Sequence, residues 1–364
     1  MKNFLKITVM ACLVILSACS KDEESTKNDD LDKAAEALES TPLEANKVSD
    51  NVKIVGGTKE DGMPPTPNEA ISLDLSNSGK IAYLNEGFEL KLKSDANITG
   101  AYIQFRGIDG TVATSYYDVN LSSNNNSGKS IKKSNSIFSK TEQTTTLDVD
   151  FNTNIPPGTF CYVICVYDAE GNISAPQEVC VTVESWGGNS AIIGAWNFKK
   201  MEETEDGVTE TIVVGEKEFD NETWTCSGQG SFDYEEFDII KDFVLTIDAD
   251  GSYKFLLNGE EKELNYNASS SGCSAIYKEV SLYTNKSEGN WAYIASENHL
   301  TMVEYFYSYE DSEGIETDTY LPGEADLLFD GTIQLNGNSL VIIIEDDYDG
   351  DGVTDELSKY YFEK

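Results

Sequence analysis

From about residue 70 to the C-terminus, the chain repeats one pattern: short runs of β-branched and aromatic residues separated by clusters of Gly, Asn, Asp and Ser. Such runs are typical of β-strands joined by turns. The polar, glycine-rich segment Ser185-Trp186-Gly187-Gly188-Asn189-Ser190 interrupts them. The sequence therefore predicts an all-β protein with two folded domains, over residues 68–185 and 191–364.

The first domain is predicted to be a β-sandwich, because its short strands recur at the spacing of that fold. Residues 159–167 are apolar on both faces, which indicates a central strand. Residues 167–176, Tyr-Asp-Ala-Glu-Gly-Asn-Ile-Ser-Ala-Pro, resemble the last turn of immunoglobulin-like and fibronectin-type sandwiches. The resemblance implies a spacer or docking module. Strands are expected at residues 71–75, 80–84, 88–93, 98–105, 115–119, 145–151, 159–167 and 178–184.

The second domain is predicted to be an antiparallel meander. Apolar residues alternate over 243–247 and again over 253–257, on either side of the turn Asp248-Ala249-Asp250-Gly251, which predicts a hairpin. Residues 291–303 and 332–342 each repeat a strand, a polar turn and a strand. Closing such a meander gives a barrel, and eight strands either fill the interior with side chains or hold one ligand.

The start of this domain, Gly194-x-Trp196, resembles the first strand of lipocalin-like domains. In that family the Trp closes one end of the barrel, and an arginine near the last strand packs over it. This chain has no arginine after Arg106. The resemblance implies a lipocalin-like β-barrel in which a lysine, such as Lys359 or Lys364, takes the place of the arginine.

The N-terminus has the composition of an export signal: Lys2 and Lys6, an apolar run over residues 7–16, and then Leu16-Ser17-Ala18-Cys19. The last four residues resemble the lipobox of bacterial lipoproteins at every position. The resemblance implies that residues 1–18 are removed and that Cys19 carries lipid, palmitate included. The alternative is an ordinary signal peptide cleaved elsewhere.

Residues 19–67 are rich in Asp, Glu, Lys, Ser, Thr, Asn and Pro, so we expect an acidic flexible tether. Its start, Ser20-Lys21-Asp22-Glu23-Glu24, resembles the tag that exports some Gram-negative lipoproteins to the outer face of the outer membrane. The chain carries a formal net charge of −39. Such an acidic surface is repelled by phosphate backbones, so the charge argues against nucleic acid as a partner.

Five cysteines follow Cys19, and an exported protein can oxidise them. Cys226 and Cys273 lie in Ser/Gly-rich loops and are predicted to pair. Cys165 and Cys180 lie on consecutive strands and are predicted to form a second disulfide. Cys161 shares the face of Cys165, so one thiol is left over, and a buried hydrophobic role is expected for it.

Residues 347–356, Asp-Tyr-Asp-Gly-Asp-Gly-Val-Thr-Asp-Glu, resemble the calcium loops of EF-hand and thrombospondin-type proteins. Alternating carboxylates around a glycine are the pattern that surrounds Ca²⁺. The alternative is an acidic hairpin turn without metal. The expected ligands are Asp347, Asp349, Asp351, Val353, Asp355 and Glu356.

Catalysis is not expected, because His299 is the chain's one histidine and a Ser/His or Cys/His pair could be built only around it. Two binding functions remain. The first is capture of a small apolar or amphipathic ligand inside the barrel. The second is glycan or protein adhesion through exposed aromatic residues, for which the candidates are Trp224, Tyr305, Tyr307 and Tyr309.

The lipobox predicts that Cys19→Ser abolishes lipid attachment, because acylation needs the Cys19 thiol. Metabolic labelling with palmitate should fail in the variant, and the protein should leave the membrane fraction. Continued labelling of the variant would contradict the assignment.

The acidic loop predicts that millimolar Ca²⁺ raises the melting temperature and that chelator lowers it. A cation bound only by the folded state adds about 2.7 kcal/mol at a hundredfold excess over Kd. The double variant Asp349→Asn, Asp351→Asn should lose the response. Identical melting curves in calcium and in EDTA, at matched ionic strength, would show an acidic turn without metal.

Overall fold

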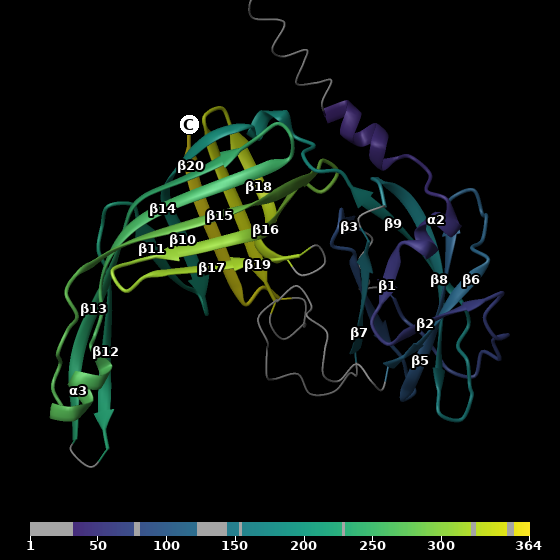
Figure 1. Cartoon of the computed structure of the whole chain (residues 1–364), viewed down its shortest axis with the longest axis horizontal. Helices are drawn as coiled ribbons and strands as arrows, with labels where there is room; N and C mark the ends of the chain where they lie inside the picture. Colours follow the sequence, from purple (N-terminus) through teal and green to yellow (C-terminus); the bar gives the residue numbers. More distant parts are fainter. Residues whose placement is uncertain are drawn as a thin grey trace, which may run out of the picture.

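A computed structural model of the chain describes residues 32–75, 81–121, 144–152, 155–227, 230–321, 325–347 and 353–364. These residues form strands in two groups, a sandwich-like domain and a barrel (Figure 1). The all-β prediction is therefore confirmed. Within the described ranges, no helix has both the length and the apolar character needed to cross a membrane.

The first domain consists of two sheets. The smaller has the order β1 (Val52–Ile54), β7 (Thr144–Phe151), β4 (Phe88–Lys93). The larger has the order β2 (Gly57–Asp61), β6 (Ser115–Asn120), β5 (Ile98–Gly107), β8 (Gly158–Asp168), β9 (Gln177–Glu184), β3 (Ile81–Tyr83). As its apolar faces predict, β8 is central, pairing with β5 and β9.

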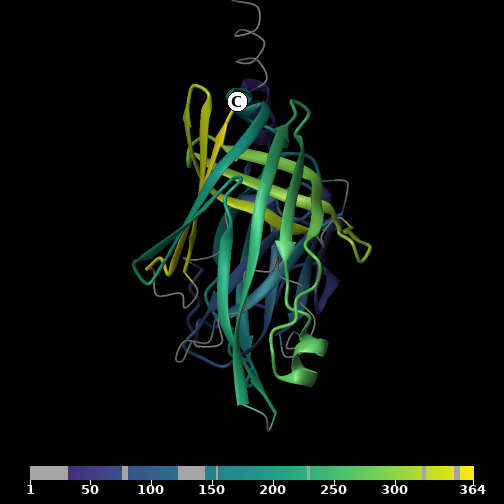
Figure 2. The same ribbon diagram turned by 90° about the vertical axis from the view of Figure 1, so that its left-hand side faces the viewer.

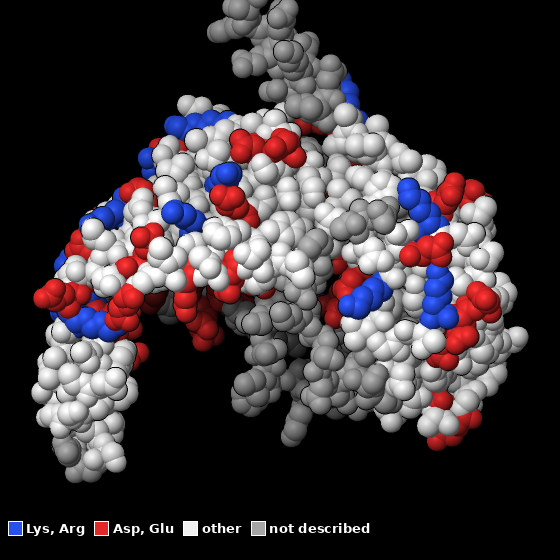
Figure 3. All heavy atoms as spheres, viewed as in Figure 1, with Lys and Arg blue, Asp and Glu red and all other residues white. Residues whose placement is uncertain are grey.

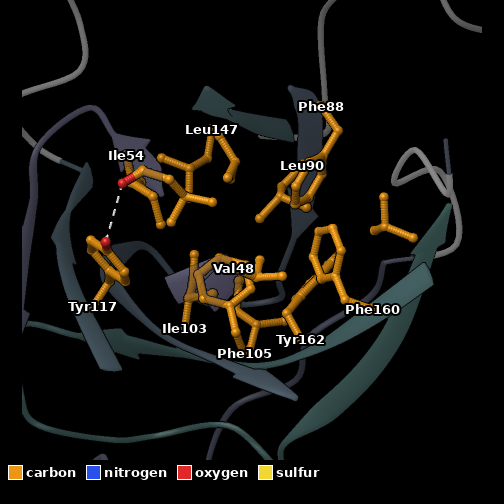
Figure 4. Close-up of a cluster of buried hydrophobic side chains, with 14 of the residues drawn as sticks. Val48, Ile54, Phe88, Leu90, Ile103, Phe105, Tyr117, Leu147, Phe160 and Tyr162 are labelled. Atoms are coloured by element: carbon orange, nitrogen blue, oxygen red, sulfur yellow. Dashed lines mark hydrogen bonds between the residues drawn. The ribbon is translucent and has the colours of Figure 1, made fainter. Parts of the chain in front are cut away.

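The two sheets pack face to face through aromatic rings. The Phe88 ring on β4 lies 5.9 Å from Phe160 and 5.7 Å from Tyr162 on β8, measured between ring centroids. Figure 4 shows these side chains pointing into the space between the sheets, together with Phe105 from β5. This contact holds the domain together.

The expected tether is wrong for residues 32–67, because much of that segment is folded. Residues 32–39 are helical, and α2 covers Ala45–Asp50. Strand β1 belongs to the smaller sheet and β2 to the larger one. Val48, Val52 and Ile54 are buried in the core, and the Tyr117 hydroxyl donates to Ser49 O at 2.8 Å. Composition averaged over the segment concealed these few apolar residues, whose partners come from distant strands. Cys19 and the signal segment lie outside the described residues.

The second domain is a closed antiparallel barrel of eight strands, so the barrel prediction is confirmed. The ring closes where Gly194–Asn197 of β10 pairs with Val244–Ile247 of β13. Three further strands attach to it, β11 (Val208–Val213), β12 (Glu218–Cys226) and β17 (Ile315–Thr319). The ring contains β10 (Gly194–Glu205), β13 (Gly230–Ile247), β14 (Ser252–Lys262), β15 (Ser281–Ile294), β16 (His299–Glu310), β18 (Asp326–Asn336), β19 (Ser339–Asp346) and β20 (Glu356–Glu363).

Trp196 closes one end of this barrel. Its side chain is fully buried, and its Nε1 donates to Ile192 O at 2.6 Å. The Lys364 Nζ lies 4.4 Å from the ring centroid and donates to Ile193 O at 3.0 Å. Of the two candidate lysines, Lys364 is therefore the one that lies over the Trp196 ring. Lys359 lies opposite Glu202 in the pairing of β10 with β20.

Aromatic side chains fill the barrel next to Trp196. The Phe243 ring lies 5.3 Å from Phe198, 5.3 Å from Phe255 and 5.4 Å from Phe362, again between centroids. These contacts give this half of the barrel a packed core.

A long hairpin extends past the barrel wall. The first part of β13, from Gly230 to Asp238, pairs with β12, and α3 (Tyr266–Gly272) lies beside them (Figure 2). The disulfide Cys226–Cys273 joins the end of β12 to the residue that follows α3, as predicted.

The second predicted disulfide is wrong: Cys180 bonds to Cys161, and Cys165 is a buried free thiol. The cause is strand register, since Cys161 lies directly opposite Cys180, whereas the pairing of β8 with β9 ends at Ile164. Burial raises the pKa of Cys165 to about 11, so the residue stays a thiol at neutral pH.

We predict that Phe243→Ala lowers the free energy of unfolding by about 3–5 kcal/mol, because it leaves a cavity among three aromatic rings. Leu256→Ala on the outer face of neighbouring β14 is the control, with an expected change within about 0.5 kcal/mol. Chemical denaturation measures both. Equal losses in the two variants would contradict a packed barrel end.

Candidate functional site

The inner face of the barrel changes character from one end to the other. Successive residues of a strand point to opposite faces, so Leu257, Gly259 and Glu261 of β14 point inward together. Gly259 lies opposite Tyr283 of β15, and a Cβ at Gly259 would lie 2.1 Å from Tyr283 Cζ. The glycine therefore lets the tyrosine ring lie across the strand.

Two stacked tyrosines separate the apolar core from a layer of carboxylates. The rings of Tyr283 and Tyr309 lie 5.7 Å apart with an interplanar angle of 23°. The Tyr283 hydroxyl donates to both oxygens of Asp238 at 2.8 and 2.9 Å. The Tyr309 hydroxyl donates to both oxygens of Glu261 at 3.1 and 3.2 Å. Each tyrosine thus has an apolar surface toward the core and a polar tip toward the open end.

The carboxylates line a groove of about 470 Å³ at the open end of the barrel. Figure 3 shows Asp and Glu gathered along the lower edge of the barrel, between the extended hairpin and the first domain. A smaller groove of about 190 Å³ shares Glu261 and Glu263 and continues to Asp311 and Glu313. The larger groove is lined by Glu210, Glu218, Phe219, Asp220, Glu236, Phe237, Asp238, Glu261, Lys262 and Glu263.

Several of these carboxyl groups are harder to ionise than usual. Burial raises the pKa of Asp238. Burial raises the pKa of Glu218 as well, and the neighbouring Asp238 and Glu210 raise it further. Glu261 follows the same pattern, through burial and the nearby Glu263. Partly desolvated carboxylates that repel one another gain stability from a cation placed between them.

The rim already uses one cation of the chain in this way. The Lys278 Nζ lies 2.8 Å from Glu263 Oε2 and 2.8 Å from Glu313 Oε1, at the smaller groove. A second ammonium, that of Lys217, lies 3.5 Å from the centroid of the Phe237 ring, which lines the larger groove. Ammonium groups of this chain therefore contact both the carboxylates and the aromatic rings of the open end.

The sequence carries a signal for this carboxylate layer, although the layer matches no known site motif. Among the residues that line the groove, acids recur at every second position in Glu218-x-Asp220 and in Glu261-x-Glu263. In a strand that spacing places them on one face. Their shared face could be inferred, but not that it points inward.

The predicted calcium loop lies partly outside the described residues, which exclude Asp349 and Asp351. The flanking strands are present as expected: β19 pairs with β20 in register from Ser339↔Glu363 to Asp346↔Glu356. Among described residues, Cys161, Glu178 and Cys180 come together as metal ligands would. The two cysteines are joined as a disulfide, so they offer no thiolates. Calcium binding stays a prediction.

The predicted aromatic adhesion surface is not assembled. The prediction assumed that side chains of β16 alternate regularly between the two faces of the sheet. A bulge between Glu304 and Phe306, opposite Glu288 and Gly289, interrupts that alternation. Tyr305 donates to Glu86 Oε1 of the first domain at 2.8 Å, whereas Tyr309 lies inside the barrel mouth. The Trp224 ring lies near the end of β12, with its centroid 5.3 Å from that of Tyr266.

His299 has an acidic partner that the sequence did not indicate. Its Nε2 lies 2.7 Å from Asp330 Oδ1, and the Thr301 hydroxyl donates to the same oxygen at 3.1 Å. In a catalytic triad the histidine stands between the acid and the nucleophile. Here the acid stands between the other two, so this group lacks the order that nucleophilic catalysis needs.

No known protein family, curated protein or solved structure matches this chain.

Proposed function

We propose that this protein is a surface-anchored, non-catalytic binding protein whose barrel takes an amphipathic cation at its open end. The observation that carries the proposal is the layered inner face: aromatic core, stacked tyrosines and then carboxylates. An amphipathic cation would place its apolar part against the tyrosines and its charge among the carboxylates.

The packed end of the barrel supports this location over a ligand deep inside. Phe198, Phe243 and Phe362 fill the space next to Trp196. Toward the mouth, Ile240, Leu257 and Tyr360 are only partly buried against that core. Apolar surface that a ligand could cover therefore lies at the mouth.

Charge complementarity selects the sign of the ligand. The groove's lining contains seven carboxylates and a single lysine, Lys262. The Lys262 Nζ lies 3.7 Å from the centroid of the Tyr277 ring, so that cation is already engaged. An anionic lipid would add charge to an already repulsive site, whereas a cation would relieve the repulsion.

The anchor is a separate part of the proposal, and it rests on the lipobox ending at Cys19. Lipid at that residue would hold the folded domains at the outer-membrane surface. The acidic groove would then face ligands outside the cell.

The test compares two fluorescent probes of equal chain length, each with a dansyl group at one end of an alkyl chain. The other end carries a free ammonium group in one probe, the amine, and a carboxylate in the other, the fatty acid. We expect saturable binding of the amine and none of the acid. The triple variant Glu218→Gln, Asp238→Asn, Glu261→Gln should bind the amine at least tenfold more weakly. Each charge pair lost contributes about 1 kcal/mol at 4 Å even at the dielectric constant of water.

A matched triple variant, Glu60→Gln, Glu170→Gln, Glu288→Gln, removes the same charge from exposed positions outside the groove. It should keep the amine affinity of the unaltered protein. Preference for the fatty acid, or equal amine affinity in both triple variants, would overturn the proposal.

A further inference from the structure

The chain that precedes the first domain is bound to the segment connecting the two domains. The Asp32 carboxylate accepts from the Ser190 backbone N–H at 2.8 Å and from its hydroxyl at 2.9 Å. The Glu39 Oε1 accepts from the Ser185 N–H at 3.1 Å and from its hydroxyl at 2.7 Å. The helical segment 32–39 thus spans the connecting residues from one end to the other (Figure 1).

The connecting segment is held by the barrel on its other side. The Gly187 N–H donates to Trp291 O at 2.8 Å, and the Tyr293 N–H donates to Gly187 O at 2.9 Å. Loss of the bonds to Asp32 and Glu39 would leave these hydrogen bonds to the barrel in place. The helical segment therefore acts as a strap over the junction.

A second carboxyl group meets Glu39 at this junction. Glu184, the last residue of β9, is 4 % exposed and hydrogen-bonds through its side chain to Glu39. Two carboxyl groups can share a hydrogen bond only when one of them carries a proton. Glu297 of the β15–β16 turn and the Tyr83 hydroxyl of β3 also face Glu184.

We propose that Glu39 and Glu184 form a proton-dependent latch, closed while they share a proton and opened when that proton is lost, which releases the strap from the domain junction. Nearby negative charge favours the protonated form of this pair of carboxyl groups. Glu297 adds negative charge, while the Tyr83 hydroxyl is hydrogen-bonded to Thr301 of the barrel at 2.8 Å. Asp330, which lies near Tyr83, holds negative charge on the same side, with His299 as its partner.

Burial, followed by the charge of Glu39, raises the pKa of Glu184 to about 8. An unfolded glutamic acid titrates near 4.3. The folded pKa is raised, so the latch contributes fully below about pH 4.3 and its contribution is lost as the pH rises through about 8. The strap is therefore closed in mildly acidic surroundings and released in alkaline ones.

The test follows hydrogen exchange of the Ser185 amide, which donates to Glu39, from pH 6 to pH 9.5. After correction for intrinsic exchange, its protection should fall by up to about tenfold per pH unit from pH 6 to about 8, and should level off above the Glu184 pKa. The Val181 amide, inside β9, reports whether the domain itself unfolds. Its protection should not follow the same profile.

Glu184→Gln keeps the shape of the protonated acid and cannot ionise, so protection of Ser185 should become independent of pH. Glu39→Gln should give the same flat profile, and it keeps the test informative where Glu184→Gln does not fold. Glu178→Gln, an exposed change on the same strand, should retain the unaltered profile. A flat profile in the unaltered protein, or an unchanged profile in both latch variants, would overturn the proposal.

Discussion

The barrel depends on one short seam, where Gly194–Asn197 of β10 pairs with Val244–Ile247 of β13. Only four residue pairs close the ring at this point. Each strand has a register shift just beyond the seam, between Phe198 and Lys200 in β10 and between Ile240 and Asp242 in β13. Bulges bend strands and increase their twist, so β10 and β13 part after the seam. The same closure thus produces a tight end and an open end.

The two ends are chemically opposite for a physical reason. The tight end brings opposite walls within contact, and aromatic rings gain stability there by excluding water. The open end keeps its walls apart, so carboxylates can remain hydrated while they face one another. Burial removes part of this hydration from Asp238, Glu218 and Glu261 and raises the pKa of each. A cation that enters the mouth would stabilise the ionised carboxylates that water hydrates incompletely.

Much of the fold was predictable because strand period and turn chemistry are local. The strand at 159–167 and the hairpin of residues 243–257 appear where their patterns place them. What depended on distant partners was not predictable. Val48 and Ile54 belong to the core because β7 and the larger sheet bury them. Cys180 bonds to Cys161 because strand register places the two residues opposite each other.

The candidate site divides in the same way. The position of Lys364 over Trp196 followed from a family resemblance and one missing arginine. The carboxylate layer is written in the sequence as alternating acids, but a period of two does not say which face points inward. Tyr283 and Tyr309 are 26 residues apart, and only the pairing of β15 with β16 brings their rings together.

The most direct test of a carboxylate mouth that recognises cations is a nuclear magnetic resonance titration of Asp238 and Glu261, with and without a saturating alkylammonium probe. Without the probe, both groups should titrate above the ordinary range of their residue type. With it, both pKa values should fall, because the bound cation favours the ionised form. Ordinary pKa values that the probe leaves unchanged would contradict the account.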